Sequence, residues 1–491
     1  MRPLTPNHPP SKQPEAIESK PSTPITGRGK DLLGNAIIRL TLKHPLFVPL
    51  VQLPNVLIFA LVIATGLWGV QQGGSNFATF VTWVIWWPLI IFTFIGVGRL
   101  WCLACPLGAV GEWSHRGVMW GKRKTNWSLD KKWPRWLRNL WLPTVLLLAV
   151  TWVDHQFTIT SSPLHTAYFV IFVLTLSVLI GLIFERRSFC RYVCPIGGMI
   201  GLYSMLAPVG LRIKDAAVCR DHLGKDCIRG NESGYGCPMF EFPQTLDRNN
   251  YCNYCMECLK TCPKNNIAIK PQHFFKDLVE TKVRRLDEAV LAVVLVGITT
   301  FQTLVMVKPW EGTLEQASRV LGVSNSLTFI ILYGLISLVV PLALYSGAVL
   351  TTKFLSREKP VPSRNLFIVF AYVFMPVGLA MHLTHNVSHL VNEGSKVLSV
   401  VSDPFGYGWN LLGISKYTPI PLLPGSVLNV TQIALIVLGQ AAAAYLGYKL
   451  SSQLFRDASK AEKVIIPMLT LAAIFSLANI WVLGLPMAHR D

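Results

Sequence analysis

Nine apolar segments of the chain are long enough to cross roughly 30 Å of hydrocarbon. Only the third of them is short, and Pro143 near its start leaves its limits open. The pattern predicts an all-α polytopic membrane protein with about nine transmembrane helices. The segments lie at about 50–70, 77–98, 139–153, 164–184, 288–307, 325–350, 366–390, 428–448 and 464–485.

The polar stretches between these segments divide the chain into four parts. Residues 1–44 are rich in Pro, Ser, Thr and Lys and have no apolar run, which predicts a disordered basic tail without an export signal. Residues 45–184 hold four spans and residues 288–491 hold five. Residues 185–287 are polar and broken by Gly and Pro, as expected of a small module inserted between two spans.

Composition and charge fix the class and the orientation. The 491 residues are 51% hydrophobic and only 14% charged, which excludes an ordinary soluble protein. Of the 45 Lys and Arg residues, all but five lie in the tail and in the loops 99–138, 185–287, 351–365 and 449–463. The positive-inside rule then predicts a multi-pass protein of the inner (cell) membrane with its N-terminus and insert in the cytoplasm and its C-terminus outside. The bilayer accounts for the net charge of +19, so no nucleic acid partner is expected.

All eleven cysteines lie between Cys102 and Cys262. The sharpest pattern is the C-x2-C-x2-C-x3-C-P run made by Cys252, Cys255, Cys258 and Cys262. Three thiolates at this spacing can bind three irons of one 4Fe-4S cluster, while the fourth binds a partner cluster. We therefore expect a ferredoxin-like α+β insert, with a zinc knuckle as the alternative.

A second, incomplete cysteine run precedes this one. By analogy with two-cluster ferredoxins, Cys237 would be the fourth ligand for the cluster of Cys252, Cys255 and Cys258. Cys219, Cys227 and Cys262 remain for the second cluster, which is one ligand short. His222 stands where a cysteine would be expected, so it is a candidate ligand. Alternatively, the missing ligand is Asp221 or a water molecule, or the cluster has only three irons. His222 would then be merely a solvated loop residue.

Two further pairs form a weak internal repeat. Cys102 and Cys105 at the inner end of the second span match Cys190 and Cys194 at the inner end of the fourth, and each pair is followed by Pro and then Gly. The pairs are expected at one depth of the bilayer, where they could ligate a third cluster, act as redox dithiols or simply pack. The nearby aromatics are expected to be core or interfacial residues: Trp83, Trp86, Trp87 and Trp101.

Residues 45–270 resemble the membrane polyferredoxin family of the NapH, NosR and CcoG type, through Cys190 to Pro195 and Cys252 to Pro263. The resemblance implies electron transfer at or across the inner membrane. The chain departs from the family in its first pair, which is C-x2-C-P, in its degenerate first ferredoxin run and in its five additional C-terminal spans.

Those additional spans contain a group of histidines. His382, His385 and His389 lie on one face of the seventh span, where ionisable groups are costly and usually functional. With His155, His165 and His489 they are expected toward the outer surface. A b-type haem held by His382 or His385 with His489 or His165, a copper or other metal site, a quinol site, and ordinary interfacial histidines all fit.

The leading hypothesis is a membrane-bound electron-transfer component of an oxidoreductase system. It would pass single electrons between cytoplasmic-face 4Fe-4S clusters and quinone or an extracytoplasmic redox partner, with a partner subunit left open. Because the clusters and the outer histidines are separated by most of the bilayer, a transmembrane route would need a relay such as haem or quinone. The alternative is an accessory protein that reduces or assembles copper or another metal for a respiratory metalloenzyme. A transporter has no support beyond the number of spans, and no phosphate-binding loop or nucleophile elbow is present.

Overall fold

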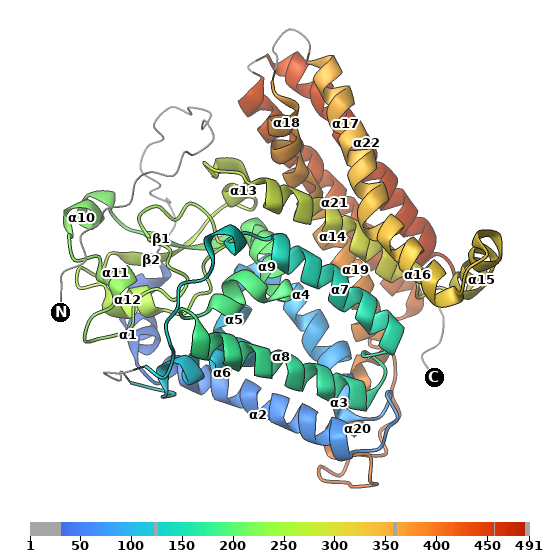
Figure 1. Ribbon diagram of the computed structural model, residues 1–491, viewed down its shortest axis with the longest axis horizontal. Coiled ribbons are helices and arrows are strands. Elements are labelled where there is room, and N and C mark those ends of the chain that lie inside the picture. The colour runs from blue at the N-terminus through green and yellow to red at the C-terminus, as the bar shows by residue number, and fades with distance from the viewer. Residues whose placement is uncertain (1–30, 122–125, 357–360, 456, 487–491) are drawn as a thin grey trace.

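The computed structural model describes residues 31–121, 126–356, 361–455 and 457–486 (Figure 1). Within these residues the fold is helical apart from one two-stranded sheet. Eight helical segments are long and apolar enough to span a membrane, which fits the expected multi-pass protein. They are Phe47–Trp68, Phe77–Arg116, Pro163–Ile183, Leu286–Leu304, Asn325–Leu355, Ser363–Ser402, Gly425–Leu454 and Ala458–Leu483.

The remaining predicted span and one further helix are shorter. The third apolar segment forms α7 (Trp141–Phe157), a helix of 17 residues that carries Pro143 in its first turn, where a proline is tolerated. The short apolar helix Pro195–Leu206 combines α9 (Pro195–Tyr203) with a 3-10 turn. It occupies the start of the predicted insert, yet it is buried among the apolar residues of the membrane spans.

The two cysteine-pair repeats are visible as related helix arrangements in the N-terminal membrane module. The first comprises α2 (Phe47–Trp68), α3 (Phe77–Thr79), the π-helical η2 (Phe80–Trp86), α4 (Trp87–Val97), α5 (Trp101–Ala104) and α6 (Pro106–Arg116). The second comprises α7, α8 (Pro163–Ile183), the π-helical η5 (Phe189–Val193) and α9. In each repeat the helix after the Cys-Pro pair packs on the first span of its own repeat and on the second span of the other: α6 on α2 and α8, α9 on α7 and α4.

The C-terminal module is a helix bundle arranged around α19 (Phe374–Glu393), which contacts α4, α14 and α21. The segment from α18 to α20 is 89% buried across its apolar window, whereas most other spans present one face outward. The module's helices are α14 (Leu286–Leu304), α15 (Pro309–Leu321), α16 (Asn325–Gly334), α17 (Val340–Leu355), α18 (Ser363–Phe370), α19, α20 (Val397–Ser402), α21 (Gly425–Leu454) and α22 (Ala458–Leu483).

The cysteine-rich insert follows α9 and lies at one end of the spans (Figure 1). Its strands β1 (Val209–Ile213) and β2 (Ile267–Pro271) pair antiparallel, with Leu211 opposite Ile269. Between and after them lie α10 (Ala216–Asp221), α11 (Asp226–Arg229), α12 (Glu257–Thr261) and α13 (Lys276–Glu280).

Part of the predicted tail belongs to this insert. Residues 1–30 lie outside the described part of the chain, but Leu32–Gly34 form η1 and Ala36–Lys43 form α1. Leu33 is fully buried in the apolar core of the insert, and Asp31 forms an ion pair with Lys214 at 3.2 Å. Leu33, with Leu42 of α1 packed against the same core, therefore attaches the end of the predicted tail to the insert.

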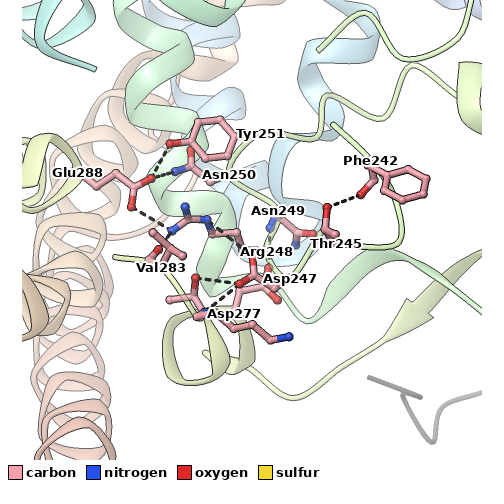
Figure 2. Close-up of polar contacts among 12 residues, drawn as sticks. Phe242, Thr245, Asp247, Arg248, Asn249, Asn250, Tyr251, Asp277, Val283 and Glu288 are labelled. Atoms are coloured by element: carbon pink, nitrogen blue, oxygen red, sulfur yellow. Dashed lines mark hydrogen bonds and ion pairs between the residues drawn. The ribbon is translucent and has the colours of Figure 1, made fainter. Parts of the chain in front are cut away.

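A buried carboxylate joins the insert to the C-terminal spans. Glu288 in α14 is fully buried and accepts hydrogen bonds from Arg248 (3.1 Å), Asn250 (2.9 Å) and Tyr251 (2.6 Å) of the insert, as Figure 2 shows. The hydroxyl of Tyr372, between α18 and α19, donates to the same carboxylate. Moving the insert away from α14 would break all of these charge-assisted hydrogen bonds at once. Glu288 therefore fixes the position of the insert on the spans.

Replacing Glu288 with Gln is expected to reduce the free energy of unfolding by about 3 kcal/mol, because the buried Arg248 guanidinium would keep only the more distant carboxylate of Asp247, at 3.9 Å, as a counter-charge. Equilibrium unfolding in detergent measures the loss. Glu280→Gln is the matched control, since its carboxylate is half exposed and only pairs with Lys276 at 3.8 Å. Equal losses in the two variants would contradict the structural role of Glu288.

Candidate functional site

The two cysteine pairs of the repeat converge, as the repeat predicts. Cys102 lies in α5 and Cys190 in η5, whereas Cys105 and Cys194 are the N-cap residues of α6 and α9. The thiol of Cys194 interacts electrostatically with each of the other three, so the four are neighbours. We refer to Cys102, Cys105, Cys190 and Cys194 as the membrane-edge set.

The surroundings of the membrane-edge set carry positive charge and N–H donors. The Gly197 N–H donates to the Cys194 sulfur at 3.2 Å, at the N-terminus of α9. The Arg99 side chain donates to Cys102 Sγ at 3.4 Å, and the Arg187 guanidinium lies 4.0 Å from Cys190 Sγ. Each arginine stands three residues before the first cysteine of its pair and is almost completely buried. Helix N-termini and buried guanidinium groups are suited to a negatively charged group held by thiolates.

The surroundings of Gly108 explain why a glycine follows the first Cys-Pro pair. A Cβ atom at this position would lie 3.2 Å from Cys190 Sγ and would overlap the Arg187 guanidinium. The absence of a side chain therefore allows α6 to approach the cysteine of the other repeat.

The complete cysteine run of the insert forms a second group, with Cys237 as its fourth member. The Cys258 thiol interacts electrostatically with Cys255, Cys237 and Cys252. The intervening residues Tyr254 and Met256 have φ values of 53° and 61°, so the loop curls into a left-handed conformation that non-glycine residues rarely adopt. Backbone N–H groups of this loop point at the sulfurs of Cys252 and Cys255. We refer to Cys237, Cys252, Cys255 and Cys258 as the first insert set.

Burial is the main reason why the thiols of the first insert set hold their protons more tightly than exposed thiols do. Desolvation raises the pKa of the Cys252 and Cys255 thiols to about 12, and that of Cys237 to about 11. A bare thiolate is disfavoured in such a site, and a bound cation that accepts the sulfur's charge removes the penalty. The donor set therefore fits a metal cluster and releases protons when the cluster binds.

The last three cysteines also come together. Cys219, Cys227 and Cys262 line one small pocket, and the imidazole of His222 lines it with them. The Asn266 side chain donates to Cys219 Sγ at 3.1 Å, while the Asn266 backbone donates to Cys262 Sγ at 3.3 Å. We refer to Cys219, Cys227 and Cys262 as the second insert set, with His222 as its candidate fourth ligand.

Two buried arginines lie between the membrane-edge set and the first insert set. Arg187 interacts electrostatically with both Cys190 and Cys255. Arg99 interacts with Cys102 and also with Cys252, and it donates to the backbone carbonyl of Asn250. On the other side, Cys258 of the first insert set interacts with Cys227 of the second. The three sets thus follow one another in space, with the first insert set in the middle.

The spacing of these donors differs from that of a mononuclear site. Across the described residues, no three His, Cys, Asp or Glu side chains converge closely enough to hold one metal ion. A zinc ion draws four sulfurs to within roughly 4 Å of each other, because each Zn–S bond is about 2.3 Å. A four-iron cluster separates its thiolates further, since each one binds a different iron.

A cavity of about 230 Å³ begins at the membrane-edge set and extends through the spans. Cys194 and Pro195 line one part of it, and His155, His385 and His389 line another. Most of the wall is apolar or aromatic and comes from η2, α7, α8, α9, α14 and α19. Trp83, Trp86 and Trp87, which the sequence predicted to be core or interfacial residues, form part of this wall.

The histidines of α19 occupy different surroundings. His382 is buried, with Nδ1 2.9 Å from the Tyr203 hydroxyl and 2.8 Å from Thr299 Oγ1. His385 and His389 have ring centroids 5.2 Å apart, and His389 pairs with Glu393 at 3.0 Å. Two such neighbouring rings on one helix cannot grip the opposite faces of a single haem.

Of the two histidines expected to pair with these, His165 does not line the cavity, and its Nδ1 is 2.6 Å from the carbonyl of Phe157. His489 lies outside the described residues. His155 of α7, which faces the same cavity, has its ring against Phe301 and Phe329.

Comparison with known proteins agrees with the cysteine geometry. A model of the family described as a 4Fe-4S binding domain matches the chain twice, at residues 79–128 and 166–214. Each match contains one of the two pairs of the membrane-edge set, which supports the internal repeat. The chain is a ferredoxin-type iron–sulfur protein.

One curated relative bears the name of an electron transport protein, YccM, of Escherichia coli (strain K12). It is 36% identical over 86 residues, which are 18% of this chain and 22% of the relative's length. No solved structure matches the chain.

If all three sets bind four-iron clusters, anaerobically purified protein will contain about twelve irons and twelve sulfides per chain. Cys105→Ser and Cys252→Ser should each lower the iron content by about four, because each removes one ligand of a different set. Chemical analysis of iron and sulfide measures this. The set hypothesis would fail if both substitutions removed the same spectroscopic signal, or if the protein contained zinc instead.

His222→Ala should change the EPR signal or lower the iron content of the second insert set alone, because it removes that set's candidate fourth ligand. His273→Ala is the matched control, since His273 is an exposed histidine of the same insert. Identical iron content and spectra in both variants would show that His222 is a solvated loop residue.

Proposed function

We propose that this protein transfers single electrons between clusters on the cytoplasmic side of the membrane and a quinone bound in the cavity within its spans. The observation that carries the proposal is the position of Cys194, which belongs to the membrane-edge set and also lines the cavity. A ligand in the cavity is therefore in direct reach of the last cysteine set. Cytoplasmic placement of the insert rests on the distribution of basic residues.

The order of the cysteine sets supports a path for electrons. The second insert set adjoins the first, and the first adjoins the membrane-edge set across Arg99 and Arg187. A four-iron cluster, when bound, supplies one-electron chemistry without requiring large movements of its ligands. The protein residues hold the ligand sulfurs, exclude water from them and place positive charge between the sets.

The cavity walls support a quinone as the ligand. Apolar and aromatic side chains dominate, as expected for a flat, hydrophobic ring with a lipid tail. Phe172 of α8 lines the cavity and is also 64% exposed on the membrane-facing surface of the helix. A lipid-soluble ligand could therefore reach the cavity from the bilayer.

Quinone reduction also needs protons, and the histidines can exchange them. Conversion of a quinone to a quinol takes up two electrons and two protons. His385 and His389 line the cavity, and Glu393, which pairs with His389, is 37% exposed at the end of α19. Imidazole and carboxylate side chains in such a row are suited to carry protons between the cavity and the outer surface.

The experiment is the reoxidation of the dithionite-reduced protein by a short-chain ubiquinone under anaerobic conditions. We expect the EPR signals of the reduced clusters to disappear on addition of the quinone. In Cys194→Ser, which removes a ligand beside the cavity, the insert signals should remain and their reoxidation should be slower. Clusters that stay reduced in the unaltered protein would refute the proposal, as would equal rates in the two proteins.

A further inference from the structure

Two buried polar groups in the cavity wall have no hydrogen-bond partner among the residues that the structure describes: Thr82 Oγ1 and Trp86 Nε1. Thr82 is 5% exposed, so water does not reach it from the surface. Buried donors without partners are rare in folded proteins, because the loss of hydration is not compensated. Two such groups beside one cavity indicate that something bound there accepts their hydrogen bonds.

The local backbone around Thr82 differs from that around most buried helical threonines. Thr144, Thr151 and Thr384 each donate to the carbonyl four residues earlier, whereas Thr328 of α16 shares the lack of a partner but lies away from the cavity. Thr82 lies in the π-helical η2, where the Trp87 N–H reaches back five residues to the Thr82 carbonyl. Single π-helical turns occur frequently at functional sites. Thr82 and Trp86 are four residues apart in this turn, so both can face one side of it.

Trp86 lies at the cluster end of the cavity. Its ring packs edge-on against that of Trp101, with centroids 5.5 Å apart, and Trp101 is followed directly by Cys102. On its other side it packs against Phe59 of α2. The Trp86 ring thus contacts the residue that directly precedes the first cysteine of the membrane-edge set.

We propose that Thr82 and Trp86 donate hydrogen bonds to a carbonyl oxygen of a quinone and hold its head group at the cluster end of the cavity. This inference rests on the proposed function and adds the residues that position the substrate. The ligand class follows from the donors, since two neutral N–H and O–H groups in an apolar wall suit an uncharged carbonyl. His385 and His389 would then face the remainder of the cavity, where protons are exchanged.

The same wall contains two matched controls. Trp83 also lines the cavity, but its indole N–H already donates to Thr166 Oγ1 at 3.0 Å. Thr151 lines the opposite wall, and its hydroxyl donates to the Leu147 carbonyl at 2.9 Å. Thr82→Val and Trp86→Phe remove orphan donors, whereas Thr151→Val and Trp83→Phe remove donors that are already satisfied. Each pair of variants makes the same chemical change within one cavity.

The test measures the KM for a short-chain ubiquinone, taken from the dependence of the rate of reoxidation of the dithionite-reduced clusters on the quinone concentration. Thr82→Val and Trp86→Phe should each raise this KM by about 2- to 10-fold, the range expected for one lost hydrogen bond, with unchanged cluster content. The two controls also alter the cavity wall but remove no free donor, so each should raise this KM less than its orphan-donor counterpart does. Infrared spectra of bound ubiquinone labelled with carbon-13 at the carbonyl provide a second readout. The carbonyl frequency, lowered in the unaltered protein, should return toward its free value only in Thr82→Val and Trp86→Phe.

The outcomes separate the two proposals. If ubiquinone reoxidises the clusters and all four variants behave alike, the assignment of Thr82 and Trp86 is wrong, while the proposed function stands. If ubiquinone does not reoxidise the clusters of the unaltered protein, the proposed function fails, and this inference fails with it. Stoichiometric haem in the cavity of the purified protein would also overturn the assignment.

Discussion

The structure depends on the compensation of negative charge at buried sulfurs beside a membrane. Thiolates in such a place are unfavourable unless positive groups surround them. Arg99 and Arg187 contribute to this, because each is buried and each faces cysteines of both the membrane-edge set and the first insert set, although Arg187 is also paired with the buried carboxylate of Glu112. The same two side chains lie between the two sets, and Arg99 also joins the spans to the insert by donating to the backbone carbonyl of Asn250.

The C-terminal spans, which distinguish this chain from the family it resembles, serve the same arrangement in two ways. Glu288 of α14 binds the insert through Arg248, Asn250 and Tyr251. Helix α19 contributes His385 and His389 to the wall of the cavity that begins at Cys194. These helices therefore provide part of the surface that the insert contacts and part of the wall of the cavity next to the membrane-edge set.

The membrane spans and the cysteine sets could be predicted from the sequence, because short stretches of sequence determine them. Apolar runs locate the spans, and cysteine spacing separates Cys252, Cys255 and Cys258 from Cys262. The pairing of Cys102 and Cys105 with Cys190 and Cys194 followed from an internal repeat and one shared depth. The role of Cys237 needed an analogy, and the structure places it in the predicted group.

Other features depend on contacts between distant segments. The helix Pro195–Leu206 is too short to be recognised as a membrane element, yet it packs within the spans. Leu33 and Leu42 lie in a stretch that the sequence assigned to the tail, and only the core of the insert reveals their place. The cavity is built by several helices, so no stretch of sequence indicates it. The orphan donor of Thr82 depends on the π-helical turn, for which the sequence gives no clear signal.

The central claim is that three cysteine sets hold three adjoining clusters that lead to the cavity. Low-temperature EPR of the fully reduced, anaerobically purified protein tests it most directly. The account predicts broadened signals from magnetically interacting clusters, with simpler signals once Cys105→Ser disrupts the membrane-edge set. A spectrum that is the sum of isolated clusters, unaffected by this substitution, would contradict it.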